Sequence, residues 1–426
     1  KVTWSVLQGA GTFSGSGLST VFVPTSTGTT KIRASLSDMN DFNNYNAEIS
    51  FTVNSLKSIT LKSDITSLPP HLDIPILADL PDDIENASFQ WYADGSPIEN
   101  AVTNTYTPTE DDIGKKISLI ITPTNSSTYR MTNYILPNTV EDHFYENGFC
   151  TECDMYEAAT LTGSEVYEIN NGGNLFWLAN EFNAENSTIP QDAAILFRDD
   201  IDLEGSQDGI EAYRKGVVKN RNFPVIGISR TYNGKMFGGY HTISDLYIKK
   251  TTTENETIQN IGLIGTTYNA LVSNLNVNGN IILDGKGTVK EIGGIIGYSS
   301  GNSSSVTIYD CSSNINITNS GSTVLHHVGG LTGALMSNKI VQNSTNFGTL
   351  KIINSDDCIG GISGYTNTGV IKACANYGSI IAENSTDQPY VGGILGYINN
   401  TTGAVKSCYN YGTLSNGNKK YCGGIV

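Results

Sequence analysis

A short glycine phrase that recurs at near-regular intervals constrains the fold of this chain more than any other feature. The phrase joins glycine to apolar residues, as in Gly293-Gly294-Ile295-Ile296-Gly297, and it returns every 31 to 36 residues. The matching glycines are Gly262, Gly294, Gly330, Gly361, Gly393 and Gly424. Fixed periods of about 20–50 residues are typical of repeat architectures. The C-terminal part of the chain is therefore predicted to be a stack of similar units.

A second phrase keeps step with the first. It places an asparagine before an apolar or aromatic residue, as in Asn346-Phe347-Gly348-Thr349-Leu350. The matching asparagines are Asn314, Asn346, Asn376 and Asn410. Two short strand-like phrases per period leave no room for the paired helices of tetratricopeptide or ankyrin repeats. We therefore expect a β-solenoid in which the glycines allow sharp corners and the stacked asparagines form a hydrogen-bonded ladder.

These phrases resemble the GLUG-type repeats of bacterial surface proteins, which occur in large adhesins and in the non-catalytic parts of immunoglobulin A proteases. The resemblance covers 160–426, because the segment before the repeats also matches, with a helix expected over 174–182. It implies a right-handed parallel β-helix over 161–426, with 161–250 as its N-terminal cap and first coils. No cap follows Val426, so we expect the β-helix to be truncated at its C-terminal end.

The first 139 residues show a different pattern of short alternating strands. Segment 1–54 holds five such runs between Gly, Ser and Pro, and it predicts a β-sandwich that is incomplete at its N-terminal end. Segment 55–139 carries a strand with Trp91, an Asp94-Gly95 turn and a later strand entered through Asp112-Ile113-Gly114. Both segments resemble bacterial immunoglobulin-like repeats of the Big type. The predicted fold class is all-β, with two immunoglobulin-like β-sandwiches followed by the right-handed parallel β-helix.

The charge of the chain bears on its partners. The sequence has 25 Lys and Arg residues against 41 Asp and Glu residues, which gives a net charge of −16. Such acidity argues against nucleic acid or an anionic membrane surface as the partner. The sequence also has no run of about 18 apolar residues, so we expect no direct membrane insertion.

The connector over 140–160 contains a Cys-x-x-Cys pair. Cys150 and Cys153 follow His143 closely in the sequence. Zinc prefers four sulfur or nitrogen ligands, and structural sites usually show two such pairs. A redox pair is typical of a βαβ setting, which the pattern does not show. Three roles therefore stay open: a local structural role as a disulfide or plain loop, a metal site, and a redox pair.

Asp199, Asp200 and Asp202 form the densest acidic cluster in a strand-like segment. Paired carboxylates can serve glycoside hydrolysis or calcium binding. Alternation with inward Ile201 and Leu203 favours an ordinary strand with outward acids. The sequence contains no His-Glu-x-x-His motif, no Gly-x-Ser-x-Gly elbow and no phosphate-binding loop. We therefore expect no catalytic residues and no cofactor, with calcium left as a candidate ion at the aspartates.

The repeats also carry cysteines. Cys374 and Cys408 each stand two residues before a matched asparagine, so adjacent coils should stack them. Their separation would then suit either a disulfide or a pair of buried thiols. Cys311, Cys358 and Cys422 fall at further inward or corner positions.

These patterns predict a secreted, non-catalytic protein of the bacterial cell surface, either an adhesin or a stalk segment. Tyr, Asn and Thr on the faces of such a rod suit a carbohydrate, or a protein surface of a host or neighbouring cell. One alternative is a carbohydrate-active β-helix enzyme, a glycoside hydrolase or lyase, that uses Asp199, Asp200 or Asp202. The second alternative is a structural subunit of a surface filament or layer.

Overall fold

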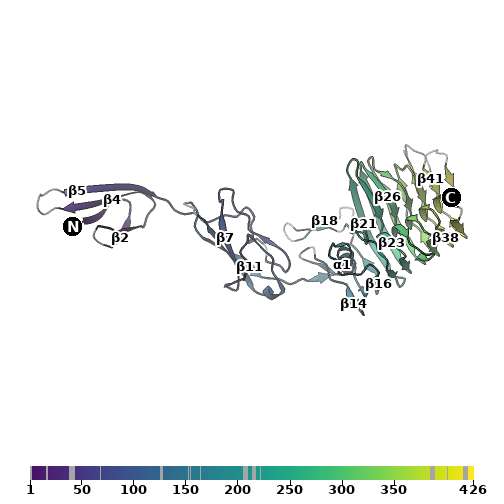
Figure 1. Ribbon diagram of the computed structural model, residues 1–426, viewed down its shortest axis with the longest axis horizontal. Helices are drawn as coiled ribbons and strands as arrows, with labels where there is room; N and C mark the ends of the chain where they lie inside the picture. Colours follow the sequence, from purple (N-terminus) through teal and green to yellow (C-terminus); the bar gives the residue numbers. More distant parts are fainter. Residues whose placement is uncertain are drawn as a thin grey trace. The chain divides into compact units, whose positions relative to one another are not determined.

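The structure is a computed structural model of the chain, and its regular elements are almost all β-strands (Figure 1). It describes residues 2–426 apart from 16–17, 38–43, 68, 125–127, 152, 154, 164, 205–209, 214–216, 221, 384–388, 401 and 416–420. The chain falls into two compact units, Lys1–Asp142 (unit 1) and His143–Val426 (unit 2). The described residues include one α-helix, α1 (Gly172–Asn183), and no helix among them has the length and apolarity to cross a bilayer.

The first part of unit 1 contains five strands. They form an antiparallel sheet in the order β1-β4-β5 and a separate hairpin of β2 and β3. The strands are β1 (Val2–Gln8), β2 (Gly11–Ser14), β3 (Val21–Pro24), β4 (Gly28–Ser37) and β5 (Asn44–Val53). Successive aromatic rings lie 5.1 to 6.2 Å apart and connect the hairpin to the sheet through Trp4, Phe13, Phe22 and Phe51. The five strands expected in this segment are confirmed.

The second part of unit 1 has a four-stranded antiparallel sheet and a short strand pair. The sheet is β11 (Thr132–Thr139), β10 (Lys116–Pro123), β7 (Ala87–Ala93) and β8 (Ser96–Pro97). The pair is β6 (Ile76–Leu77) with β9 (Thr105–Tyr106), and a 3-10 turn, η1 (Glu110–Asp112), follows it. Trp91 of β7 is fully buried, stacks on Tyr106 at 5.7 Å and donates its ring N–H to the Thr103 carbonyl at 2.9 Å. Trp91 is therefore a core residue of this part of unit 1.

Unit 2 is a β-solenoid. Its strands stack into four sheets, and within the described residues every pairing in these sheets is parallel except that of β14 with β15. The nine-stranded sheet is β14 (Thr160–Thr162), β15 (Val166–Ile169), β16 (Ala194–Phe197), β20 (Lys235–Phe237), β24 (Leu271–Ser273), β28 (Val306–Tyr309), β33 (Ile340–Gln342), β38 (Val370–Lys372) and β43 (Ala404–Lys406). The ten-stranded sheet is β17 (Ile201–Asp202), β21 (Thr242–Thr252), β25 (Asn276–Gly285), β29 (Ser312–Asn319), β34 (Thr345–Asn346), β35 (Leu350–Ile352), β39 (Ala375–Asn376), β40 (Ile380–Ala382), β44 (Tyr409–Asn410) and β45 (Leu414–Ser415).

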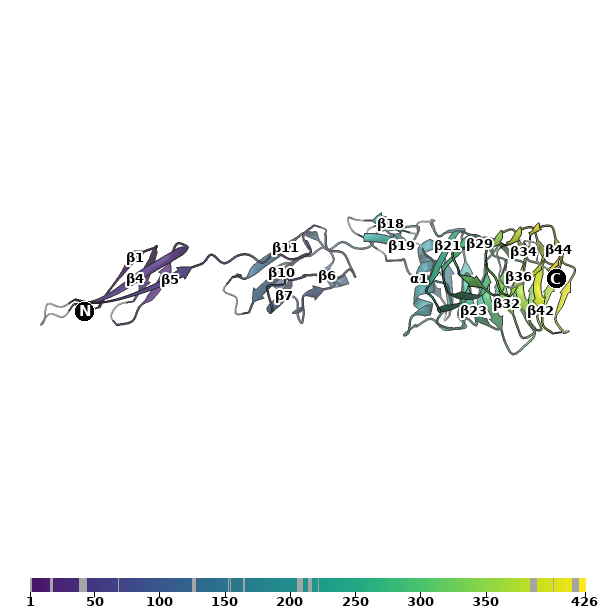
Figure 2. The same cartoon turned by 90° about the horizontal axis from the view of Figure 1, so that it is seen from above.

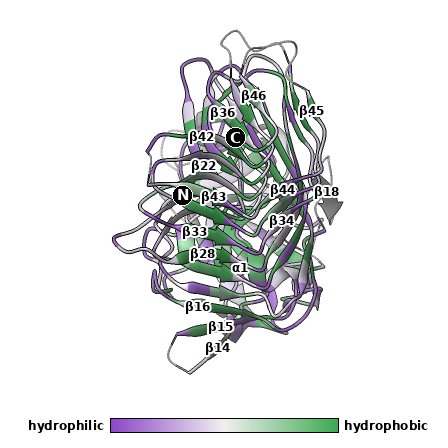
Figure 3. Cartoon of the chain, turned by 90° about the vertical axis from the view of Figure 1, so that its right-hand side faces the viewer, coloured by the Kyte–Doolittle hydropathy of each residue, from purple (hydrophilic) through white to green (hydrophobic). Residues whose placement is uncertain are grey.

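The other two sheets complete each coil, and the successive coils are seen nested in Figure 3. The seven-stranded sheet is β22 (Thr257–Ile261), β26 (Thr288–Gly293), β30 (Val324–Leu325), β31 (Val328–Gly329), β36 (Cys358–Gly360), β41 (Tyr390–Gly392) and β46 (Cys422–Gly423). The five-stranded sheet is β23 (Ile264–Tyr268), β27 (Ile296–Ser300), β32 (Thr332–Leu335), β37 (Ser363–Thr366) and β42 (Leu395–Ile398). Two hairpins lie outside these sheets: β12 (Tyr145–Glu146) with β13 (Phe149–Cys150), and β18 (Ile210–Tyr213) with β19 (Val217–Asn220). The solenoid predicted from the repeat is confirmed.

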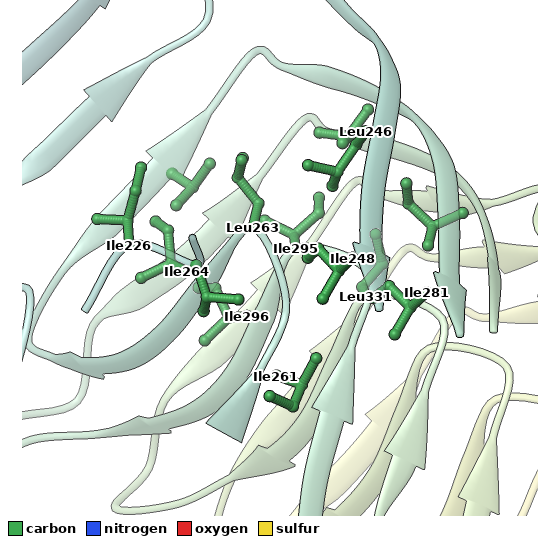
Figure 4. Close-up of a cluster of buried hydrophobic side chains, with 14 of the residues drawn as sticks. Ile226, Leu246, Ile248, Ile261, Leu263, Ile264, Ile281, Ile295, Ile296 and Leu331 are labelled. Carbon is green, nitrogen blue, oxygen red and sulfur yellow. The ribbon is translucent and has the colours of Figure 1, made fainter. Parts of the chain in front are cut away.

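The interior of the coils is filled by branched apolar side chains. Leu263, Ile295 and Leu331 occupy equivalent positions of successive coils and are fully buried (Figure 4). Each such side chain contributes about 1.5–3 kcal/mol when it leaves water. Every added coil therefore extends one continuous core, which explains why a single repeat could not fold alone.

Helix α1 covers the beginning of this core (Figures 1 and 2). It begins at a capping residue, Asn171, whose side chain accepts a hydrogen bond from the Asn174 amide at 2.9 Å. Its apolar face is buried and consists of Leu175, Phe176, Leu178, Ala179 and Phe182. The predicted helix is confirmed, and antiparallel β14 occupies the adjacent edge of the nine-stranded sheet.

The repeat glycines serve close packing, and the expectation that they form sharp corners is wrong. None of the six adopts a left-handed φ; the left-handed corner is instead taken in successive coils by non-glycine residues, Asn274, Asp310, Asn343, Ala373 and Ser407. A Cβ atom on Gly361 would lie 2.2 Å from the Gly393 carbonyl oxygen and 2.4 Å from Asn376 Cγ. Gly294, Gly330 and Gly393 face the next coil in the same way. Glycine is therefore required here because neighbouring coils leave no space for a side chain.

Three of the four matched asparagines form the expected ladder. Asn346 Nδ2 donates to Asn376 Oδ1 at 2.8 Å, and Asn376 Nδ2 donates to Asn410 Oδ1 at 2.8 Å. Asn314 does not belong to it, because Ser313 is the residue that pairs in register with Asn346. The side chain of Asn314 is exposed instead. A one-residue offset moves a strand side chain to the opposite face, which explains the error.

Candidate functional site

The β12–β13 hairpin positions the Cys-x-x-Cys pair against the solenoid cap. Its two-residue turn, Asn147-Gly148, has φ angles of 48° and 76°, as a type I′ turn requires. The Asn147 carbonyl accepts a hydrogen bond from the Gly173 amide at 3.0 Å. A Cβ on Gly148 would lie 1.9 Å from Asn171 Oδ1, so only glycine fits beside the helix cap. The hairpin is therefore held at the first turn of α1.

Phe149 anchors the next part of the hairpin. Its ring is 1% exposed and packs edge-on against Phe176 of α1 at 5.5 Å and against Tyr156 at 6.0 Å. The Cys150 amide donates to the Met155 carbonyl at 3.0 Å, which closes the loop that carries Cys153. Packing and backbone hydrogen bonds together fix the place of both cysteines.

The structure brings the three predicted residues together. Cys150 is 0% exposed and Cys153 3% exposed. Cys153 Sγ lies 3.6 Å from His143 Nδ1, and the ligand atoms of all three residues lie within 4.8 Å of one another. All seven cysteines of the chain are described, and none forms a disulfide. Two soft thiols and an imidazole at this spacing are a ligand set that suits zinc.

The acidic cluster does not converge on one site. Asp200 Oδ1 accepts from the Thr242 amide at 2.9 Å, and Asp202 Oδ1 accepts from the Glu204 amide at 2.8 Å. Asp199 Oδ1 accepts from the amide of Asp200. All three aspartates are exposed, while Ile201 and Leu203 are buried, as predicted. These carboxylates accept hydrogen bonds from nearby backbone, and Asp200 Oδ1 also lies 3.4 Å from His241 Nδ1.

A second polar group lies on the solenoid between successive coils. His327 Nε2 lies 2.9 Å from Asp357 Oδ2, its Nδ1 lies 3.5 Å from Glu291 Oε1, and its ring stacks on Tyr365 at 4.7 Å. Burial opposes the charge on His327, but hydrogen bonds to both carboxylates outweigh it and raise its pKa to about 9. Although His327, Asp357 and Cys358 could offer ligands, a protonated imidazole is a poor metal ligand. The group is best described as an ion pair network.

Cys374 and Cys408 stack in adjacent coils, as expected. The Cys408 sulfur lies 3.5 Å from the Cys374 amide nitrogen, and both residues are thiols. Hydrogen bonding from the Cys374 thiol holds the pKa of Cys408 below its usual value. Of the two states that the sequence left open, the structure shows the pair of thiols.

Exposed aromatic residues form a row on one face of the solenoid. Phe347, Tyr377 and Tyr411 each follow an asparagine of the ladder, and they are 50%, 50% and 63% exposed. Their ring centroids are 5.3 and 4.8 Å apart, with interplanar angles of 13° and 11°. We call these three residues the aromatic row. Because its rings cover one another's faces, the row presents ring edges and two tyrosine hydroxyls to solvent.

No protein-family model and no curated protein sequence matches the chain.

Proposed function

We propose that this chain is a non-catalytic, extracellular protein of a bacterial cell surface. In this proposal the solenoid is a right-handed helix of the GLUG type that presents a binding face to a carbohydrate or protein ligand. The two parts of unit 1 are immunoglobulin-like sandwiches of the Big type that act as spacers. The buried, stacked Trp91 in the second part supports that assignment.

The aromatic row is the observation that carries the proposal. Large rings are usually buried, and a contiguous exposed group of them on a rigid surface is typical of an interaction site. Tyr377 and Tyr411 sit on successive coils, so their hydroxyls repeat along the stack. Tyrosine edges of this kind combine apolar contact with hydrogen bonding at a low entropic cost. An extended ligand that lies along the stack would contact every ring of the row.

A paired assay on glycan and protein arrays tests the proposal. We expect binding by the unaltered chain, loss of at least tenfold in affinity on Tyr377→Ala with Tyr411→Ala, and no loss on Tyr268→Ala. Tyr268 is a matched control because it is 40% exposed and lies in another sheet of the solenoid. Binding that survives removal of the row would refute the row as the site.

The same samples distinguish the alternatives. New reducing ends from the bound glycans, abolished by Asp200→Asn, would establish the carbohydrate-active enzyme instead. Ordered polymers in electron micrographs of the concentrated protein, without ligand binding, would establish the filament or layer subunit.

A further inference from the structure

We propose that Cys374 and Cys408 form an oxidation site, at which a low-molecular-weight disulfide converts the two thiols into a disulfide bond between successive coils. Both residues lie in unit 2, and the structure shows them as thiols. The inference goes beyond the proposed function and is independent of it, because neither cysteine belongs to the aromatic row.

Strand pairing stacks the two cysteines on each other. Ala375 pairs in register with Tyr409, and a cysteine directly precedes each of them in the chain. Cys374 and Cys408 are therefore equivalent positions of two successive coils. Paired strands lie about 4.8 Å apart, which falls within the range of about 4.4–6.8 Å that separates the Cα atoms of a disulfide. The coils thus already have the spacing that the bond requires.

The two side chains also have the same orientation. Cys374 Sγ lies 3.3 Å from the carbonyl oxygen of Lys372, and Cys408 Sγ lies 3.3 Å from the carbonyl oxygen of Lys406. Each contact joins a sulfur to the carbonyl two residues before it. Cys408 Sγ is in addition 3.5 Å from the Cys374 amide nitrogen. The sulfur of one coil therefore lies beside the cysteine of the other.

The two thiols differ in a way that suits a stepwise reaction. Cys408 is half-buried, whereas Cys374 is 1% exposed, so a reagent in solution reaches Cys408 more easily. The hydrogen bond from the Cys374 thiol lowers the pKa of Cys408 to about 7, and the thiolate is the reactive form of cysteine. Cys408 is therefore the attacking thiol, and Cys374 is the thiol that completes the bond.

The reaction balances with the low-molecular-weight disulfide as the oxidant. The Cys408 thiolate attacks one sulfur of the reagent, forms a mixed disulfide and releases the other half of the reagent as a thiolate. The Cys374 sulfur then attacks the sulfur of Cys408, and the second half of the reagent leaves with the Cys374 proton. The two protein thiols lose two electrons, and one reagent disulfide is reduced to two thiols.

The same position of the preceding coils cannot react in this way. Those coils carry Cys311 and Ser344 there, and the Cys311 amide donates to Ser344 Oγ at 3.1 Å. Ser344 forms no disulfide and separates Cys311 from Cys374 along the stack. Cys311 is also 3% exposed, and burial raises its pKa to about 12. Cys311 is therefore an unreactive thiol at a matched position.

Oxidation of the full chain tests the inference. The chain is reduced, treated with oxidised glutathione near neutral pH, blocked at its remaining thiols, digested and measured by mass spectrometry. We expect a peptide pair linked through Cys374 and Cys408, which disappears on reduction. Cys422 is an internal control, because it is exposed and pairs in register with Val391, so it should keep its mixed disulfide with glutathione. Modification of Cys422 without the linked pair would overturn the inference.

Single variants identify the attacking thiol. Cys374→Ser should stop at glutathione bound to Cys408, and Cys408→Ser should take up glutathione at Cys374 at least tenfold more slowly. Both variants should fold, because Ser344 already occupies the equivalent position of the coil before Cys374. Cys311→Ser is the matched control and should form the linked pair at an unchanged rate. Equal rates of uptake at the two cysteines would refute Cys408 as the attacking thiol.

Discussion

Replacing Asn376 with alanine should destabilise the coils around it far more than its position in a short strand suggests. The side chain is fully buried, and its Oδ1 accepts from Asn346 Nδ2 at 2.8 Å. Its Nδ2 donates to Asn410 Oδ1 at 2.8 Å and to the Gly378 carbonyl at 2.9 Å. One substitution therefore breaks three hydrogen bonds and removes the side-chain links from this coil to both of its neighbours.

The size of the effect follows from those three bonds. A hydrogen bond in a folded protein contributes about 0.5–1.5 kcal/mol net, and a buried group left without a partner costs about 1–3 kcal/mol. Asn346 Nδ2 keeps its second bond to the Gly348 carbonyl, so one of its protons loses a partner and the amide stays partly satisfied. We expect a loss of about 3–5 kcal/mol, confined to neighbouring coils because repeats contact only their neighbours.

Hydrogen exchange measured by mass spectrometry is the suitable assay, because a solenoid need not unfold in one step. Peptides covering 346–412 should exchange faster in Asn376→Ala, while peptides covering 242–285 should not change. Asn314→Ala is the control: it removes an asparagine from the same sequence phrase, but one that is exposed and outside the ladder. Its effect should stay within about 0.5 kcal/mol. Equal effects of the two substitutions would refute the ladder as a source of stability.

Two further predictions concern the coils. Gly361→Ala should lower the stability of its coil by about 1–3 kcal/mol in the same exchange assay, because its Cβ would overlap the next coil. Gly424→Ala is the control and should be neutral, because a Cβ there would have no atom within 4 Å. Equal losses of stability in the two variants would contradict the packing argument. The pKa of His327 is raised to about 9 from an ordinary value of 6.5, which corresponds to about 3 kcal/mol of folding stability. This contribution is fully present below pH 6.5 and is lost as the pH rises through 9. The melting temperature should therefore fall between pH 6.5 and 9.5, and His327→Gln should remove that fall; a fall of the same size in the variant would assign it to other groups.

Much of the solenoid could be predicted from the sequence because its period repeats in residues that have few other uses. The glycine phrase, the α1 helix and the strand at Ile201–Asp202 lie where the pattern predicts them. Register was harder to predict. The Asn314 phrase looks like its neighbours, but only strand pairing shows that it is offset by one residue.

Other features could not be read from single residues. Ala373 and Ser407 are poor candidates for left-handed backbone, yet in two successive coils they occupy the corner that Asn343 takes in the coil before them. Stacking fixes the path of the chain there, so the position dictates the conformation and residue preference does not.

The stacking direction of the solenoid has a mechanical consequence. Hydrogen bonds between coils run along the stack, whereas each strand runs across it. A pull on the end of the stack would load the hydrogen bonds of the last coil first. The load would reach the next coil only after the last coil had separated. Each released coil of about 31 residues would free about 100 Å of extended chain. Under tension such a solenoid would lengthen in steps, dissipating the load while the coils behind the break stay folded.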